Sequence, residues 1–191
     1  MNRFARALMA VNFVLALVAS ARVAPGRAQS VAPLTTRDGH KDFDFLVGTW
    51  RTHYRLLKHR LSNDHEWYDC NGASVIRPFW DGYGNLEDGD LRCPGSRIVG
   101  LTLRVYSAQT HQWSLWWGTK TRGVVPPPQV GHFDDRGVGM FYAHDKHDGK
   151  PIIERFKWTL MPGDHPYFEQ AYSPDSGKTW ETNWTCLYTR A

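Results

Sequence analysis

Residues 98–106, Ile-Val-Gly-Leu-Thr-Leu-Arg-Val-Tyr, alternate aliphatic side chains with glycine, threonine, arginine and tyrosine. A period of two places these two sets on opposite faces of a β-strand. Working outward, residues 111–118 place two tryptophans on one face, and residues 50–57 repeat the pattern with Trp50 and Tyr54. The centre and the first third of the chain therefore predict β-strands.

Further strand-like segments continue to the C-terminus between turns rich in glycine, proline and aspartate. They are residues 67–78 (two strands bent at Asn71-Gly72), 84–91, 130–133, 138–144, 151–160, 167–173 and 182–189. One stretch, Leu56–Leu61, is helix-like. Strands joined by short turns usually pair with their sequence neighbours, and closing such a sheet removes its edges. We therefore predict an all-β fold, an up-and-down antiparallel β-barrel of about ten strands. The alternative, a β-sandwich, needs longer cross-connections than most of the gaps provide.

The composition of the 191-residue chain is that of one globular domain. It is 41% hydrophobic and 22% charged, which excludes a disordered chain and a membrane bundle. Aromatic residues make up 14% and include nine tryptophans. Since eight strands already enclose an interior that side chains fill or that holds a small ligand, about ten strands predict an aromatic-lined cavity.

The N-terminus resembles an export signal. Arg3 and Arg6 precede an apolar run from Ala7 to Ala19, which is too short for a membrane span, and small residues follow that suit cleavage. We predict a cleavable signal peptide at residues 1–28, a lead-in linker at 29–40 and the barrel domain at 41–191. The expected location is periplasmic or secreted, with no stable membrane span after cleavage. An uncleaved N-terminal anchor is the alternative.

Removing this leader changes the charge balance. The whole chain carries 23 basic and 19 acidic residues, a net charge of +4, but residues 1–28 hold four arginines and no acid. Cleavage at that point leaves 19 of each, and cleavage after Ala21 leaves +2. Because nucleic-acid binding needs a basic patch on the mature domain, a nucleic-acid partner is not expected. The oligomeric state stays open.

Three cysteines in an exported chain allow three single disulfides. We favour Cys70–Cys93, because these residues flank the Gly/Asp-rich stretch Asp81–Asp90, and we expect Cys186 to stay a buried thiol. Three reduced, buried cysteines are an equally compatible alternative. No cysteine or histidine spacing predicts a metal site.

The stretch Phe43-Asp-Phe-Leu-Val-Gly48-Thr-Trp50 precedes the first strand. It resembles the opening of the calycin superfamily, which includes the lipocalins, where a Gly-x-Trp begins the first strand and the tryptophan closes one end of the barrel. The chain also resembles an uncharacterised bacterial exported family with a lipocalin-like barrel. The similar pieces are Phe43–Leu46, Trp50 with Tyr54-Arg55 and Leu57, Gly84-Asn85, Thr102–Arg104, Trp113-Ser114, Arg155-Phe156 with Trp158, Glu169–Ala171 and Thr179–Trp184. This resemblance implies a fold more firmly than an activity.

Some calycins bind haem through a histidine inside the barrel. The resemblance carries no match for that ligand, since residues 182–189 contain no histidine, so neither haem nor another cofactor is expected.

Our first hypothesis is a carrier that binds a small, mainly hydrophobic or planar ligand in the cavity. Its predicted ligand-binding residues are Trp50, Tyr54, Arg55, Arg104, Trp117, Arg155, Trp158, Glu169, Gln170 and Trp184. The second hypothesis is an isomerase- or hydrolase-type enzyme that uses Glu169 as general acid or base, because a carboxylate inside an apolar barrel has a raised pKa. A structural ion pair between Glu169 and a strand arginine is the alternative reading. The third hypothesis is an interaction domain with a filled barrel.

Three remaining motifs are read as turns or loops. His144–Asp148 is expected to be a solvated hairpin turn rather than a metal site, and the acidic stretch Asp81–Asp90 a rim loop over the barrel mouth. The segment Ser173–Trp180 resembles the Asp-box hairpin, in which Asp175 accepts backbone N–H groups.

Overall fold

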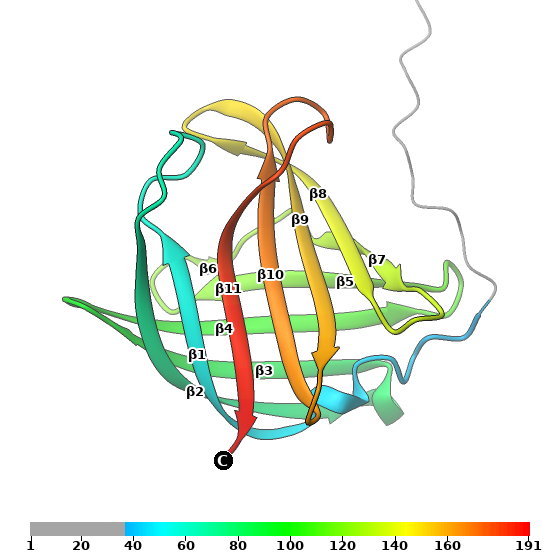
Figure 1. Ribbon diagram of the computed structural model, residues 1–191. Coiled ribbons are helices and arrows are strands. Elements are labelled where there is room, and N and C mark those ends of the chain that lie inside the picture. Colours follow the sequence, from blue (N-terminus) through cyan, green and yellow to red (C-terminus); the bar gives the residue numbers. More distant parts are fainter. Residues whose placement is uncertain (1–36) are drawn as a thin grey trace, which may run out of the picture. The chain divides into compact units, whose positions relative to one another are not determined.

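The computed structural model describes residues 37–191 (Figure 1). The predicted signal peptide and residues 29–36 of the predicted linker lie outside the described residues. The described part contains two short 3₁₀ helices, η1 (Asp44–Leu46) and η2 (Trp80–Gly82). Its strands are β1 (Gly48–Leu57), β2 (Trp67–Phe79), β3 (Gly84–Cys93), β4 (Ser96–Ser107), β5 (Gln112–Thr119), β6 (Gly123–Val124), β7 (Gln129–Phe133), β8 (Gly139–His147), β9 (Lys150–Met161), β10 (His165–Ser173) and β11 (Glu181–Arg190).

The strands form a closed antiparallel barrel. The sheet runs β4-β3-β2-β1-β11-β10-β9-β8-β7-β5-β6, and an additional pairing of β4 with β5 closes it. The two-residue strand β6 pairs with β5 alone, so ten strands make the ring. In Figure 1, β3, β4 and β5 cross behind β1, β11, β10 and β9. The all-β, up-and-down barrel expected from the strand pattern is confirmed.

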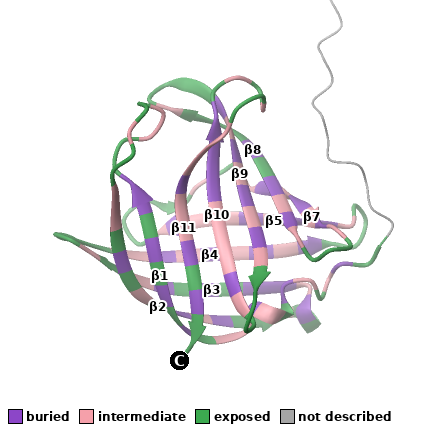
Figure 2. Ribbon diagram, in the orientation of Figure 1, coloured by how far each residue is buried: buried purple, intermediate pink, exposed green. Residues whose placement is uncertain are grey.

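Burial alternates along the strands, as the pleat requires (Figure 2). The chain just before β1 plugs one end of the barrel, where Phe43, Leu46 and Trp50 are almost fully buried. The Trp50 indole nitrogen donates to the Leu46 carbonyl at 2.7 Å, and the Trp113 indole nitrogen donates to Gly39 at 2.9 Å. These bonds tie the entering chain to the strands and close this end.

The expected bend at Asn71-Gly72 is wrong, because β2 is one continuous strand. Gly72 pairs with Thr52 on one side and Leu91 on the other. A Cβ at Gly72 would lie 2.4 Å from the Asp90 carbonyl oxygen. Glycine therefore serves here for close strand approach rather than for a turn.

Two further expectations about local structure are also wrong. The acidic stretch Asp81–Asp90 is not a rim loop, since most of it forms β3, with Asn85 and Glu87 buried. An ion pair inside the barrel compensates the charge of Glu87, so this residue can be buried in a strand. The stretch Leu56–Leu61 is not helical, because β1 continues to Leu57 and a turn follows.

A disulfide joins Cys70 to Cys93, and Cys186 is a buried free thiol. The two half-cystines lie on neighbouring strands β2 and β3, with Cα atoms 4.3 Å apart. The bridge therefore fastens the outer end of the β3–β4 hairpin to β2.

The Asp-box segment forms the connection between β10 and β11. The Asp175 carboxylate accepts the backbone N–H groups of Lys178 and Thr179 at 3.0 and 2.9 Å and the Thr179 hydroxyl at 2.7 Å. These hydrogen bonds, led by the one from Thr179, lower the pKa of Asp175 to about 2. The motif acts here as a turn.

Candidate functional site: the barrel cavity and its mouth

The barrel encloses a narrow cavity of about 40 Å³. Aromatic side chains form most of its wall, and a few polar groups interrupt them. The lining residues are Tyr54, Glu87, Thr102, Arg104, Leu115, Trp117, Phe156, Trp158, Phe168, Gln170, Trp184 and Tyr188.

Trp117 and Trp184 contact each other in the cavity wall. Their ring centroids are 5.6 Å apart with planes at 86°, and the Tyr54 ring lies 6.2 Å from Trp184. Trp117 occupies the space left by Gly100, where an added Cβ would lie 2.1 Å from the indole. The strands thus shape an edge-to-face aromatic wall, which suits a flat apolar molecule.

A buried ion pair lies on the other side of the cavity. Arg104 is fully buried and donates to Glu87 at 2.5 Å and to Asn85 at 2.9 Å. The second Glu87 oxygen accepts the Tyr188 hydroxyl at 2.9 Å. The Arg104 guanidinium also lies 5.0 Å from the Trp158 ring centroid. Burying both charges is expensive unless they are paired and hydrogen-bonded, and this network supplies most of the partners.

Three N–H donors of the cavity wall have no hydrogen-bond partner within residues 37–191. They are the Nε of Arg104 and the indole nitrogens of Trp158 and Trp184, and all three atoms are buried. Buried polar groups in folded proteins are nearly always paired, so each exception requires a cause. The unpaired lining groups are all donors, which match an oxygen acceptor.

A second carboxyl group is buried beside the cavity. Glu154, on β9, accepts a hydrogen bond from Gln129, whose own side-chain oxygen has no partner in the described part of the chain. Burial raises the pKa of Glu154 to about 7, opposed by the Gln129 hydrogen bond and the Arg60 charge. Glu154 is therefore partly protonated near neutral pH.

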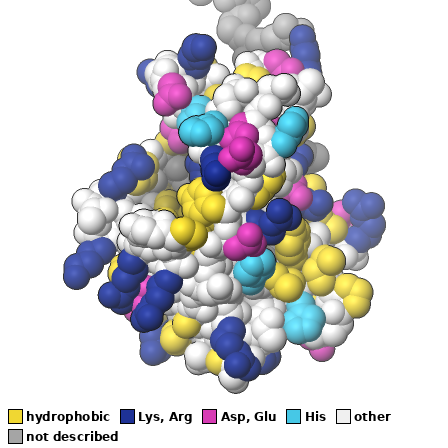
Figure 3. All heavy atoms as spheres, turned by 60° about the vertical axis from the view of Figure 1, so that its left-hand side comes forward, with side chains coloured by type: hydrophobic (Ala, Val, Ile, Leu, Met, Phe, Trp, Pro, Cys, Tyr) yellow, Lys and Arg dark blue, Asp and Glu magenta, His cyan; other side chains and the backbone are white. Residues whose placement is uncertain are grey.

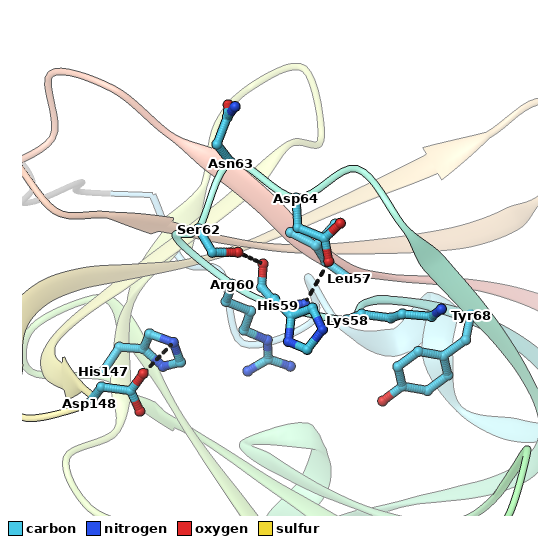
Figure 4. Close-up of a pocket in the computed structure, with 10 residues that line it drawn as sticks. All are labelled: Leu57, Lys58, His59, Arg60, Ser62, Asn63, Asp64, Tyr68, His147 and Asp148. Carbon is cyan, nitrogen blue, oxygen red and sulfur yellow. Dashed lines mark hydrogen bonds and ion pairs between the residues drawn. The ribbon is translucent and has the colours of Figure 1, made fainter.

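An open groove of about 890 Å³ lies near the cavity, because Arg60 of its wall is 6.0 Å from the ring centroid of Trp184 in the cavity wall (Figure 4). Its walls come from the β1–β2 loop, including Lys58, His59 and Arg60, and from the β8–β9 turn at His147 and Asp148. Figure 4 shows the Arg60 guanidinium extending from the loop into this groove.

The structure brings six of the ten predicted ligand-binding residues to the cavity wall. They are Tyr54, Arg104, Trp117, Trp158, Gln170 and Trp184. Trp50 is buried in the core below them.

The other three predictions are wrong, because the side chains lie outside the barrel. Arg55 is exposed, packs over Trp67 at 5.4 Å and lies 3.7 Å from Asp69. Arg155 and Glu169 form an ion pair at 3.0 Å. The Arg155 guanidinium is 4.5 Å from the Trp180 ring centroid. Successive side chains of a strand point to opposite faces. Because Phe156 and Gln170 point inward, their neighbours Arg155 and Glu169 point outward.

Sequence reasoning missed Glu87, Glu154 and Arg60. Glu87 lay both in the expected strand of residues 84–91 and in the expected rim loop Asp81–Asp90, and Arg60 lay in an expected helix. Glu154 could have been predicted from the period-two alternation of β9, because Glu154, Phe156 and Trp158 share one face of that strand.

No family model and no curated protein matches this chain. Among solved structures, the barrel is similar to "Structure of S-type Phycobiliprotein Lyase CPES from Guillardia theta". The TM-score is 0.55 at 14% sequence identity, covering 78% of this chain and 90% of that chain. This likeness shows the lipocalin-like barrel fold. The resemblance to an uncharacterised exported bacterial family stays a prediction.

Within residues 37–191, no three His, Cys, Asp or Glu side chains gather in a way that would hold a metal ion. The same residues contain no helix with the length and apolarity needed to cross a membrane.

Proposed function

We propose that this protein binds a small, mainly hydrophobic or planar molecule inside its barrel. The observation that carries the proposal is the set of unpaired N–H donors in an aromatic wall, at Arg104, Trp158 and Trp184. A barrel interior that serves packing alone gains nothing from such donors, because an unmet buried donor costs about 1–3 kcal/mol. A ligand with an oxygen acceptor and an apolar body satisfies both parts of the wall.

The cavity of about 40 Å³ holds roughly one water molecule. A ligand of ten or more heavy atoms therefore enters only with movement of wall side chains. Trp117 and Trp184 are half-buried residues of the wall and are the side chains that we expect to move. A filled barrel acting as an interaction domain is the competing function, and the small volume favours it.

We infer that the protein works after export, in the periplasm or outside the cell. The leader-like composition of residues 1–28 supports this location. The Cys70–Cys93 disulfide adds support, because such bonds persist in oxidising compartments.

The enzyme hypothesis based on Glu169 receives no support from the structure. Glu169 is on the outer face and paired with Arg155, so it cannot act on a molecule in the cavity. Glu87 does line the cavity, but Arg104 and Tyr188 occupy its oxygens.

Native mass spectrometry of protein purified from its own host tests the proposal. A retained small molecule, released when Trp117 is changed to alanine, would support a carrier. The matched control is Trp80→Ala, since Trp80 is 69% exposed on the outer surface. Recovery of the bare polypeptide mass, with no tryptophan fluorescence change across a panel of planar compounds, would favour the filled barrel.

A further inference from the structure

The β1–β2 loop places one arginine where the open groove meets the aromatic wall. Arg60 lines the groove, and its guanidinium lies 6.0 Å from the ring centroid of Trp184, which lines the cavity beneath. A molecule reaching from the cavity into the groove passes this guanidinium. Arg60 thus occupies the junction between the two spaces.

The contacts that position Arg60 are with neutral groups. Its guanidinium donates to the Tyr172 hydroxyl at 2.9 Å and lies 5.4 Å from the Tyr172 ring centroid. The loop itself is fastened to β11, because the Leu61 backbone N–H donates to the Glu181 carboxylate at 2.7 Å. Arg60 is therefore held in place without a carboxylate at ion-pair distance within residues 37–191.

Among the nearby acids, buried Glu154 is close enough for the Arg60 charge to oppose the rise of its pKa, but its hydrogen bond is with Gln129 and not with Arg60. The acids of the loop and the turn are engaged elsewhere. Glu66 pairs with Lys58 at 2.5 Å, and the Asp64 carboxylate accepts the backbone N–H groups of His59 and Glu66. Asp148 lies 3.7 Å from His147, with its side chain 89% exposed. The face in Figure 3 carries basic, acidic and histidine side chains together, so neither sign of charge dominates there. Selection of an anion would therefore depend on Arg60 itself.

Trp184 adds a second donor at this junction. Its indole nitrogen is buried and has no partner in the described part of the chain. A guanidinium fork and an indole N–H are both donors, and a carboxylate offers acceptors to both.

From this geometry we propose that the ligand is an amphipathic carboxylic acid. Its apolar or planar body enters the cavity as Trp117 and Trp184 move apart, and its carboxylate binds Arg60 at the mouth. Since the inference rests on ligand binding in the cavity, it deepens the function proposed above. It adds the charge of the ligand and names Arg60 as the residue that binds the charged group.

A matched pair of fluorescent probes tests the proposal, namely 2-naphthylacetate and 2-(2-naphthyl)ethanol. They share one ring system and differ in the carboxylate. Isothermal titration calorimetry with protein made from the full chain measures both affinities at low and at physiological salt. We expect the acid to bind about tenfold more tightly at low salt, and salt to reduce the difference.

The variant Arg60→Gln is expected to bring the two affinities within about twofold and to leave alcohol binding unchanged, since the lost interaction is with the charge. Arg60→Lys keeps the charge without the fork and retains part of the preference. Arg55→Gln is the matched control, because Arg55 also stacks on a tryptophan but lies outside the barrel. Thermal unfolding checks that each variant is folded.

The outcomes separate the two proposals. Equal binding of acid and alcohol by the wild-type protein, or an unchanged preference in folded Arg60→Gln, overturns the anion site and leaves the carrier intact. The wild-type comparison decides even where a variant does not fold. Binding of neither probe overturns both proposals.

Discussion

The buried pair Arg104–Glu87 makes a quantitative prediction about stability. The two side chains are 0% and 6% exposed, whereas the outer pair Arg155–Glu169 is 17% and 18% exposed. Glu87→Gln keeps the shape of the side chain but leaves a guanidinium uncompensated inside the barrel. Removing one partner of a buried pair costs about 3–5 kcal/mol, so we expect that loss in the free energy of unfolding.

Glu169→Gln is the matched control, because it removes the same charge from an ion pair near the surface. Pairs of this kind contribute at most about 1 kcal/mol. For a domain of this size, about 1 kcal/mol shifts the melting temperature by roughly 2–4 °C. Glu87→Gln should therefore lower it by about 6–20 °C and Glu169→Gln by less than about 4 °C.

Urea denaturation and calorimetry at pH 7 measure both variants. A third protein, Glu87→Leu with Arg104→Met, removes both charges and should be more stable than Glu87→Gln alone. Equal losses for Glu87→Gln and Glu169→Gln would refute the reasoning, because burial would then make no difference to the cost.

Two further predictions concern the disulfide and a buried acid. The Cys70–Cys93 bridge spans 23 residues, so replacing both cysteines by alanine should destabilise the protein by about 3 kcal/mol in denaturant titrations. Cys186→Ala keeps the bridge, so reductant should destabilise this variant as much as the wild-type protein. Because the folded pKa of Glu154, about 7, lies above its ordinary value of 4.5, the folded state binds more protons between these values. Stability should therefore fall by up to roughly 3 kcal/mol as pH rises from 4.5 to 7. Glu154→Gln should flatten that slope; a slope that persists unchanged would point instead to Asp42, whose pKa burial raises to about 6.

The fold followed from local rules that a single sequence displays. Period-two alternation and frequent turn residues predict strands without any knowledge of their partners, and short connections then favour neighbour pairing. The exceptions occurred where tertiary contacts override a local signal. Asn71-Gly72 has the composition of a turn, yet Gly72 is needed because Asp90 and Thr52 approach it closely.

The site was harder to predict, because alternation gives two faces without saying which one is inside. On β4 the inward set is Gly100, Thr102, Arg104 and Tyr106, while the aliphatic set from Val99 to Val105 is half-buried on the outer face. A rule that apolar residues point inward would have exchanged the inner and outer faces of this strand. The same ambiguity placed Glu169 in the cavity, whereas the structure puts it on the outer face in an ion pair with Arg155.

The polar interior of this barrel argues for recognition rather than for packing. An apolar replacement of a buried ion pair is often neutral or stabilising, so stability alone does not explain why Arg104 and Glu87 lie among aromatic rings. A pair retained to specify the fold would be expected to have all of its donors satisfied, since a partly satisfied network is worse than an apolar core. Arg104 Nε and the indole nitrogens of Trp158 and Trp184 instead belong to lining residues of the cavity and are unpaired within residues 37–191. An acceptor from outside the chain would complete the network, which is why the proposed ligand is placed beside these donors.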